Sequence, residues 1–137
     1  SIGPNIFGKE QYLSKKTDIL WMQLVGSARK DNVSILSISG YRSFAYQEEL
    51  INNKLKKGIL IDDILRVNAP PGYSQHHAGI AIDIATIGTP PLTEIFETTA
   101  AFQWLETFAS DFNFSMPYVK NNNYGFIYEP WHWSVNT

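Results

Sequence analysis

The sequence contains no cysteine among its 137 residues. This absence excludes disulfide bonds and every metal site built on thiolates, although it does not fix the cellular compartment. No run of 18 or more apolar residues is present, so nothing predicts a membrane-spanning helix. Acidic and basic residues are interspersed, the formal net charge is −2, and no basic stripe indicates a nucleic-acid partner.

Length and composition predict one packed domain over residues 1–137. A chain of this size can bury about two-thirds of its unfolded surface. Hydrophobic residues make up 44% and aromatic residues 14%, which favours a globule over a disordered chain. Because the sequence begins with Ser1 rather than Met, we expect a mature or trimmed domain whose targeting segment, if any, is absent from this sequence. We expect it to act as a monomer.

Helices and strands follow one another irregularly along the chain. Apolar spacing predicts helices at 17–30, 44–58, 61–67 and 98–112. Runs rich in β-branched residues predict strands at 32–40, 79–85 and 126–134, the last interrupted by Pro130. Residues 68–74 are predicted to be a loop and 119–125 a turn. The order lacks regular βαβ alternation, so we predict an α+β domain with a small, mostly antiparallel sheet and flanking helices.

An aspartate interrupts the most apolar strand, "GIAIDIA". Alternation places Asp83 on one face with Gly79, Ala81 and Ala85, and these small residues leave space beside the carboxylate. An isolated carboxylate in apolar surroundings is unfavourable, so we expect it to meet a cation or a metal ion. The simpler alternative is that Asp83 caps a loop or pairs with an arginine.

The three histidines lie on either side of this aspartate in the chain. His76 and His77 precede the strand, and His132 follows Glu129 by three residues in "EPWHW". Each histidine taken alone could be an ordinary polar loop residue. One histidine of the pair, Asp83 and His132 would together form a three-ligand set typical of catalytic zinc, which leaves a fourth position for water. Glu129 would then be the carboxylate that accepts the proton of the water.

Three motifs in the chain resemble those of a known family. "SQHHAGIAID" fits Ser-x-His-x-x-Gly-x-Ala-x-Asp, "EPWH" fits Glu-x-Trp-His, and "SGYRSFAYQ" is similar to Gly-Tyr-Arg-Ser-x-x-x-Gln. The motifs occur in family order, and the resemblance covers about residues 35–133. They are the signatures of the zinc D-alanyl-D-alanine carboxypeptidases of the vancomycin-resistance type and their L,D-carboxypeptidase relatives, in the M15 or LAS peptidase superfamily. Hedgehog-type signalling domains resemble the same fold.

The resemblance implies one Zn²⁺ ion per chain, held by His76, Asp83 and His132. The motif places the ligand at His76, so His77 is expected to be a neighbour only. A set of this kind also accepts other divalent ions.

The other motif positions imply roles in catalysis and substrate binding. The resemblance implies that Glu129 is the catalytic base and later the acid, and that Arg42 polarises the scissile carbonyl. It also implies that Gln47 and Ser74 help hold the terminal D-residue of the substrate. Arg42 as a surface side chain and Ser74 as a plain turn residue are the alternatives.

Two departures from the family pattern limit these expectations. Relatives often carry an arginine where this chain has Ser134, and a Tyr-Pro pair where this chain has Met116 and Pro117. The nearest tyrosine is Tyr118, to which the sequence assigns no firm role. Fine specificity is therefore not predicted.

The resemblance implies a zinc carboxypeptidase of the bacterial cell envelope, acting at the periplasm or cell surface. It would remove a terminal D-alanine from peptidoglycan stem peptides or muropeptides, with D,D activity favoured over L,D activity. An endopeptidase is a further alternative. A zinc-containing binding module is the alternative outside the enzymes, but such a module would not need Glu129, Arg42 and Gln47. No organic cofactor is implied.

Overall fold

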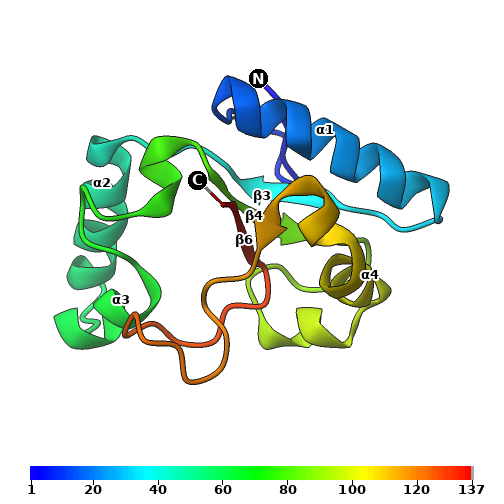
Figure 1. The fold of residues 1–137 in the computed structure, drawn as a ribbon. Coiled ribbons are helices and arrows are strands. Elements are labelled where there is room, and N and C mark those ends of the chain that lie inside the picture. The colour runs from blue at the N-terminus through cyan, green and yellow to red at the C-terminus, as the bar shows by residue number, and fades with distance from the viewer. Residues whose placement is uncertain (137) are drawn as a thin grey trace.

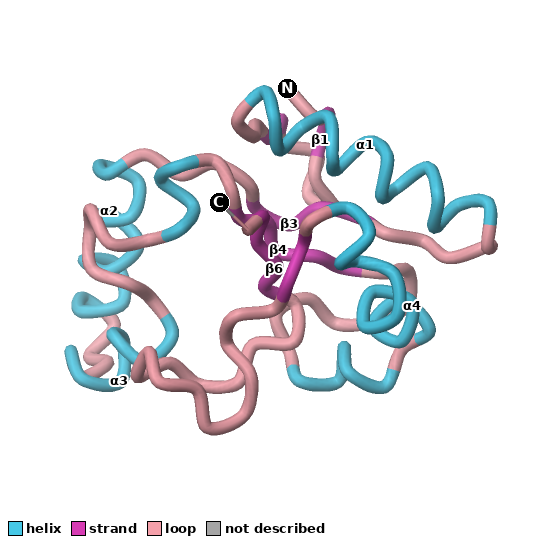
Figure 2. The backbone as a smooth tube through the Cα atoms, in the orientation of Figure 1, coloured by secondary structure: helices cyan, strands magenta, loops and turns pink. Residues whose placement is uncertain are grey.

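The computed structural model describes residues 1–136 (Figures 1 and 2). The helices are α1 (Lys15–Lys30), α2 (Phe44–Lys56), α3 (Ile61–Val67) and α4 (Ala100–Phe108). The strands are β1 (Gly3–Pro4), β2 (Glu10–Gln11), β3 (Leu36–Ser39), β4 (Ala81–Ala85), β5 (Phe114–Ser115) and β6 (His132–Val135). Short 3₁₀ helices are η1 (Gln75–Ala78), η2 (Glu94–Thr98) and η3 (Ala109–Phe112). Within residues 1–136, no helix has the length and apolar character needed to cross a membrane.

A four-stranded antiparallel sheet in the order β3-β4-β6-β5 forms the centre of the fold. β4 is an inner strand in which every residue is buried. Its Asp83 lies opposite Ser39 of β3 and opposite His132 of β6. β1 and β2 form a separate two-stranded ribbon. The predicted α+β class with a small antiparallel sheet is confirmed.

Helices α1 and α4 pack against the sheet to form the hydrophobic core. Trp21, Leu24 and Ala28 of α1 recur at helical spacing and are buried with Phe102 and Leu105 of α4. The core also contains Ile82 and Ile84 of β4 and Trp133 and Val135 of β6. Figure 1 shows α2 and α3 on the other side of the sheet, away from α1 and α4. The strands therefore have a packed apolar side and a side that faces α2 and α3.

The predicted helices are close to those observed, except that one predicted helix is divided in two. Ser43 caps α2 by accepting a hydrogen bond of 3.0 Å from the Tyr46 amide. The segment predicted as one helix at 98–112 is α4 followed by η3. The strands predicted at 32–40 and 79–85 are shorter in the structure. β1, β2, β5, η1 and η2 were not predicted.

The strand predicted at 126–134 is wrong in its first two-thirds. Residues 126–131 form no strand, and β6 begins at His132. Pro130 lacks the amide proton that a strand ladder needs, and the chain turns there, with the His132 amide donating to the Glu129 carbonyl at 3.2 Å. This turn holds Glu129 next to the first residue of β6.

Candidate active site

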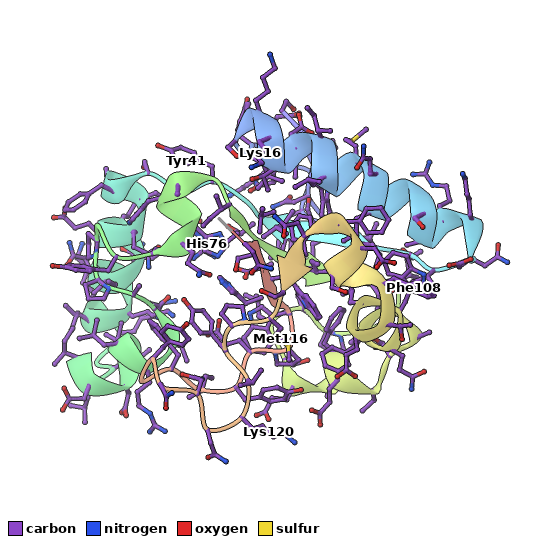
Figure 3. The ribbon with its side chains drawn as sticks, in the orientation of Figure 1. Lys16, Tyr41, His76, Phe108, Met116 and Lys120 are labelled. Carbon is purple, nitrogen blue, oxygen red and sulfur yellow. The ribbon has the colours of Figure 1, made fainter. Side chains whose placement is uncertain are left out.

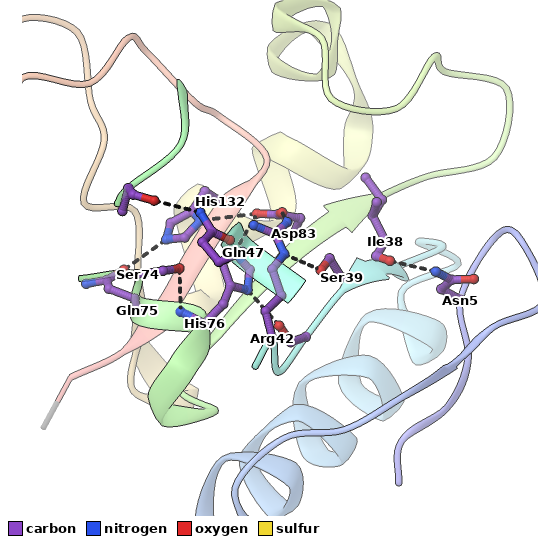
Figure 4. Close-up of polar contacts among 12 residues, drawn as sticks. Asn5, Ile38, Ser39, Arg42, Gln47, Ser74, Gln75, His76, Asp83 and His132 are labelled. Carbon is purple, nitrogen blue, oxygen red and sulfur yellow. Dashed lines mark hydrogen bonds and ion pairs between the residues drawn. The ribbon is translucent and has the colours of Figure 1, made fainter. Parts of the chain in front are cut away.

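The three predicted metal ligands meet at one buried point. The histidines and the aspartate are each 3% exposed. Asp83 Oδ1 lies 3.1 Å from His132 Nδ1 and 3.5 Å from His76 Nε2. One possible ligand atom from each residue lies within 4.8 Å of the other two, so the group is able to hold a metal ion. Figure 4 shows the three side chains converging from η1, β4 and β6.

Local structure explains why these side chains converge. Antiparallel pairing places Asp83 directly opposite His132. Ser74 caps η1 by accepting a hydrogen bond of 3.1 Å from the His76 amide. Gly79 then turns the chain into β4 with a φ of 69°, and a Cβ there would lie 2.7 Å from the Ser14 amide nitrogen. Only glycine fits this turn, which orients η1 over the sheet; Figure 3 marks His76 on this element.

The outer nitrogen of each ligand histidine is bound to a fixed acceptor. His76 Nδ1 lies 2.7 Å from the Gly40 carbonyl oxygen, and His132 Nε2 lies 2.8 Å from Gln75 Oε1. Both acceptors require the facing nitrogen to donate its proton, which leaves His76 Nε2 and His132 Nδ1 unprotonated toward Asp83. Metal-binding histidines are commonly held in this way. The arrangement fits a divalent metal, and Gln75 was not singled out from the sequence.

Electrostatics keeps the donor set in a form able to bind a metal. Burial acts to raise the pKa of Asp83, but the neighbouring His76 and His132 and the Arg42 guanidinium hold it well below its usual range. Burial lowers the pKa of His76, although Asp83 opposes this effect. Asp83 is therefore ionised at neutral pH, and neutral imidazole is favoured at His76.

Glu129 lies beside the donor set, in the same cavity of about 290 Å³ as His76, Asp83 and His132. The side chain is buried, and its backbone amide donates to the Tyr118 carbonyl at 2.9 Å. Burial and the charge of Asp83 raise the pKa of Glu129 to about 8, against Arg42 and Lys54, which lower it. A carboxyl group that titrates near neutral pH can both accept and return a proton.

Arg42 joins the site through an ion pair. Its Nη2 donates to Asp83 Oδ2 at 2.9 Å, and its Nε donates to Ser39 Oγ at 2.9 Å. The side chain is 16% exposed and lines the cavity. The alternative of an ordinary surface arginine is therefore wrong. Asp83 does pair with an arginine, as the simpler alternative proposed. The same carboxylate also belongs to the group that is able to hold a metal ion.

His77 lies outside the donor set and connects two loops. Its Nδ1 donates to the Arg42 carbonyl at 2.8 Å, and its Nε2 accepts from the Gly72 amide at 3.0 Å. Its ring stacks with Phe44, with ring centroids 6.4 Å apart. Both nitrogens bind backbone groups, so His77 holds the Arg42 segment against the loop that precedes Ser74.

Gln47 and Ser74, the predicted substrate-binding residues, both line the cavity. Gln47 is 1% exposed on α2, and its Nε2 donates to the Ala69 carbonyl at 2.8 Å. Its Oε1 is buried with no hydrogen-bond partner among the described residues. Gln47 therefore ties α2 to the cavity-lining segment 67–69. Its Oε1 remains available as a hydrogen-bond acceptor.

Tyr118 has a position at the site that the sequence did not indicate. Its ring centroid lies 4.6 Å from that of His132, and the residue is 8% exposed and lines the cavity. Burial, with a contribution from Glu129, raises the pKa of Tyr118 to about 12. Trp131 also lines the cavity, and both Trp131 and Trp133 belong to the hydrophobic core. The available sequence signal was the Met116-Pro117 pair, which stands where relatives carry Tyr-Pro and is followed directly by Tyr118.

Comparison with known proteins gives matches over nearly the whole chain. The family model of VanY, described as D-alanyl-D-alanine carboxypeptidase, matches residues 10–136. The candidate carboxypeptidase YodJ of Bacillus subtilis (strain 168) is 30% identical over 128 residues, which are 90% of this chain and 46% of YodJ. The chain therefore spans about half the length of this curated relative.

Solved structures that share the fold at higher than 25% identity include an L,D-carboxypeptidase and a D,D-pentapeptidase. The structure of the LdcB LD-carboxypeptidase has a TM-score of 0.84 and 28% identity, covering 97% of this chain and 64% of that one. A mutant of the vancomycin-resistance D,D-pentapeptidase VanY in complex with Zn(II) has a TM-score of 0.76 and 26% identity, covering 96% of this chain and 76% of that one.

Proposed function

The chain belongs to the VanY family of D-alanyl-D-alanine carboxypeptidases, and from this premise we propose that it is a zinc-dependent hydrolase that removes a terminal D-alanine from peptidoglycan stem peptides. The observation that carries the proposal is one cavity lined by His76, Asp83, His132, Glu129 and Arg42. The first three residues form the metal-binding group, and the other two supply a proton acceptor and a fixed cation. A binding module has no need for the last two.

The donor set is suited to zinc. Two imidazole nitrogens and one carboxylate oxygen make three ligands, which leave an open position on the metal. The Zn(II) complex of a structurally similar VanY supports this choice of metal. When bound, Zn²⁺ would supply Lewis acidity at the open side of His76, Asp83 and His132.

Glu129 is proposed to carry protons during hydrolysis. In its ionised form it accepts a proton from the water that attacks the carbonyl carbon of the peptide bond. It then returns the proton to the nitrogen of the departing D-alanine as the C–N bond breaks. The pKa of about 8 places both forms within reach near neutral pH.

Arg42 is proposed to bind the carbonyl oxygen on which negative charge develops. Its Nε and Nη2 are held by Ser39 and Asp83, so the guanidinium plane is fixed before substrate arrives. A fixed cation stabilises a transition-state oxyanion without the cost of reorganisation. His77 supports this position through the Arg42 carbonyl.

The bond specificity is proposed from the family. We place cleavage of D-Ala-D-Ala, as in pentapeptide stems, ahead of cleavage of the L,D bond in tetrapeptides. The VanY structure is described as a D,D-pentapeptidase and the LdcB structure as an L,D-carboxypeptidase, so relatives of both kinds share this fold. Gln47 and Ser74 are proposed to shape the site for the terminal residue. The substrate places the activity in the bacterial cell envelope.

Release of D-alanine tests the proposal. The zinc-loaded protein is incubated with a muramyl pentapeptide, a muramyl tetrapeptide and a cross-linked dimer, and products are separated by mass. D-Alanine from the pentapeptide is the expected result. Release of D-alanine from the tetrapeptide alone would show that the protein cleaves the L,D bond rather than the D,D bond. Cleavage of the dimer alone would identify an endopeptidase, and no cleavage of any substrate would favour a binding module.

A further inference from the structure

Two basic side chains line the cavity, and they differ in their partners. Arg42 is paired with Asp83 at 2.9 Å. Lys54 of α2 is half-buried and also lines the cavity. Within residues 1–136, no carboxylate lies within 4.0 Å of the Lys54 ammonium. An ammonium in a cavity without an anionic partner is available to an anionic ligand.

Lys54 lies on the cavity side of α2 because of helical spacing. It follows Gln47 by seven residues, which is two helical turns, so the two side chains share one face. Gln47 is fixed to Ala69, and residues Val67, Asn68 and Ala69 line the cavity beside them. Burial and the charge of Arg42 lower the pKa of Lys54, while Glu129 raises it. The ammonium is therefore close enough to sense both proposed catalytic groups.

The polar atoms around Lys54 explain why a carboxylate needs this ammonium. Gln47 uses one N–H of its amide on the Ala69 carbonyl, and its buried Oε1 is an acceptor that cannot donate to a carboxylate. Two of the Arg42 nitrogens are already engaged by Asp83 and Ser39. A carboxypeptidase must nevertheless recognise the free terminal carboxylate of its substrate, since an endopeptidase substrate has none there.

We propose that Lys54 is a specificity-determining residue that binds the C-terminal carboxylate of the departing residue. The inference rests on the proposed carboxypeptidase function and adds the group that makes the enzyme an exopeptidase. The Ser74 hydroxyl, on the same cavity, is a second donor for that carboxylate. Lys54 takes no part in bond breaking, so its loss weakens recognition of the terminus and leaves the chemical step intact.

The test compares substrates with and without the terminal charge. The pentapeptide and the tetrapeptide are each prepared as the free acid and as the C-terminal amide. Lys54→Met keeps the length of the side chain and removes its charge, Lys54→Arg keeps the charge, and Lys56→Met removes an exposed charge from the same helix. We expect Lys54→Met to lower kcat/KM for the acid about 10- to 100-fold, mainly through KM, and to change the amide less than about threefold. Lys54→Arg should restore part of the preference, and Lys56→Met should match wild type.

Equal losses on acid and amide, or an unchanged preference for the acid in Lys54→Met, would overturn the inference. Calorimetry separates this failure from failure of the proposed function. Acid and amide peptides are titrated into the zinc-loaded Glu129→Gln protein with and without Lys54→Met. If wild type cleaves neither peptide, the hydrolase proposal fails, yet tighter binding of the acid that depends on Lys54 would still support the inference. Equal binding of acid and amide would overturn it.

Discussion

Asp83 of β4 lies directly opposite His132 of β6, with 3.1 Å between Asp83 Oδ1 and His132 Nδ1. The pair joins segments 49 residues apart in the sequence, and antiparallel pairing alone brings them together. His76 completes the group from η1 on the loop that leads into β4. The proposed metal centre is therefore built on the two inner strands of the sheet, and the proposed catalytic residue Glu129 lies on the turn that precedes β6.

The donor set predicts a sharp division between the adjacent histidines. His76→Ala or Asp83→Asn should reduce bound zinc from one per chain to well below half, and kcat/KM should fall at least about 10³-fold. His77→Asn should retain the zinc, because both ring nitrogens of His77 bind backbone groups. Elemental analysis after gel filtration measures the zinc. Loss of zinc in His77→Asn with retention in His76→Ala would reverse the assignment.

Glu129 should be required for turnover and dispensable for the metal. Glu129→Gln keeps the shape of the side chain but cannot accept a proton, so we expect kcat to fall about 10²- to 10⁴-fold with zinc content unchanged. Exposed Glu49 of α2 offers the matched control Glu49→Gln. Steady-state release of D-alanine gives kcat, and activity of Glu129→Gln within threefold of wild type would contradict the role.

The buried carboxyl of Glu129 also predicts how the stability of the metal-free protein depends on pH. Its pKa rises from 4.5 to about 8 on folding. Below pH 4.5 Glu129 is protonated in both the folded and the unfolded protein, so it does not change the free energy of unfolding. As the pH rises toward 8, Glu129 ionises in the unfolded chain first, so the free energy of unfolding falls. Metal-free Glu129→Gln should match wild type near pH 4.5 and exceed it by about 2 to 4 kcal/mol near pH 9. Urea titrations of protein from which a chelator has removed the metal measure the free energy of unfolding. The same difference between the two proteins at both pH values would contradict the prediction.

Gln75 should control how firmly the metal is held. Its Oε1 accepts from His132 Nε2 and so fixes the ring nitrogen that faces Asp83. Gln75→Leu should speed dissociation of zinc to a chelator about 10- to 100-fold, whereas Gln75→Glu keeps an acceptor and should hold zinc at least as well as wild type. Equal dissociation rates in wild type and Gln75→Leu would show that His132 needs no such partner.

Loss of the Arg42 cation should slow the chemical step more than it weakens binding. Arg42→Met should reduce kcat about 10²- to 10³-fold with a smaller change in KM, since the guanidinium acts on charge that develops in the transition state. The variant also leaves Asp83 without its ion pair, so zinc content and thermal unfolding must be measured in parallel. A change confined to KM would assign Arg42 to substrate binding instead.

The sequence was most informative where a motif names its residues. His76, Asp83, His132, Glu129 and Arg42 were all singled out, and the structure places them around one cavity. α1 and α2 were also predictable, because apolar spacing and Ser43 are local signals.

Contacts between distant segments were beyond the reach of the sequence. Gln75 meets His132 across 57 residues, and no spacing rule indicates that contact. Tyr118 and Lys54 have ordinary sequence surroundings, and only the folded arrangement brings them to the cavity. Residues 126–131 were assigned to a strand because their apolar content outweighed Pro130 in the sequence pattern. The turn at that proline is the feature that positions Glu129.

The central claim is that the metal held by His76, Asp83 and His132 is required for hydrolysis. The most direct measurement follows zinc content and D-alanine release in one sample as zinc is removed by chelation and then returned. We expect one zinc per chain, activity that falls in proportion to the zinc removed, and recovery of activity on adding one equivalent of zinc. Full activity in zinc-free protein, or one bound zinc without hydrolysis of any stem peptide, would contradict it.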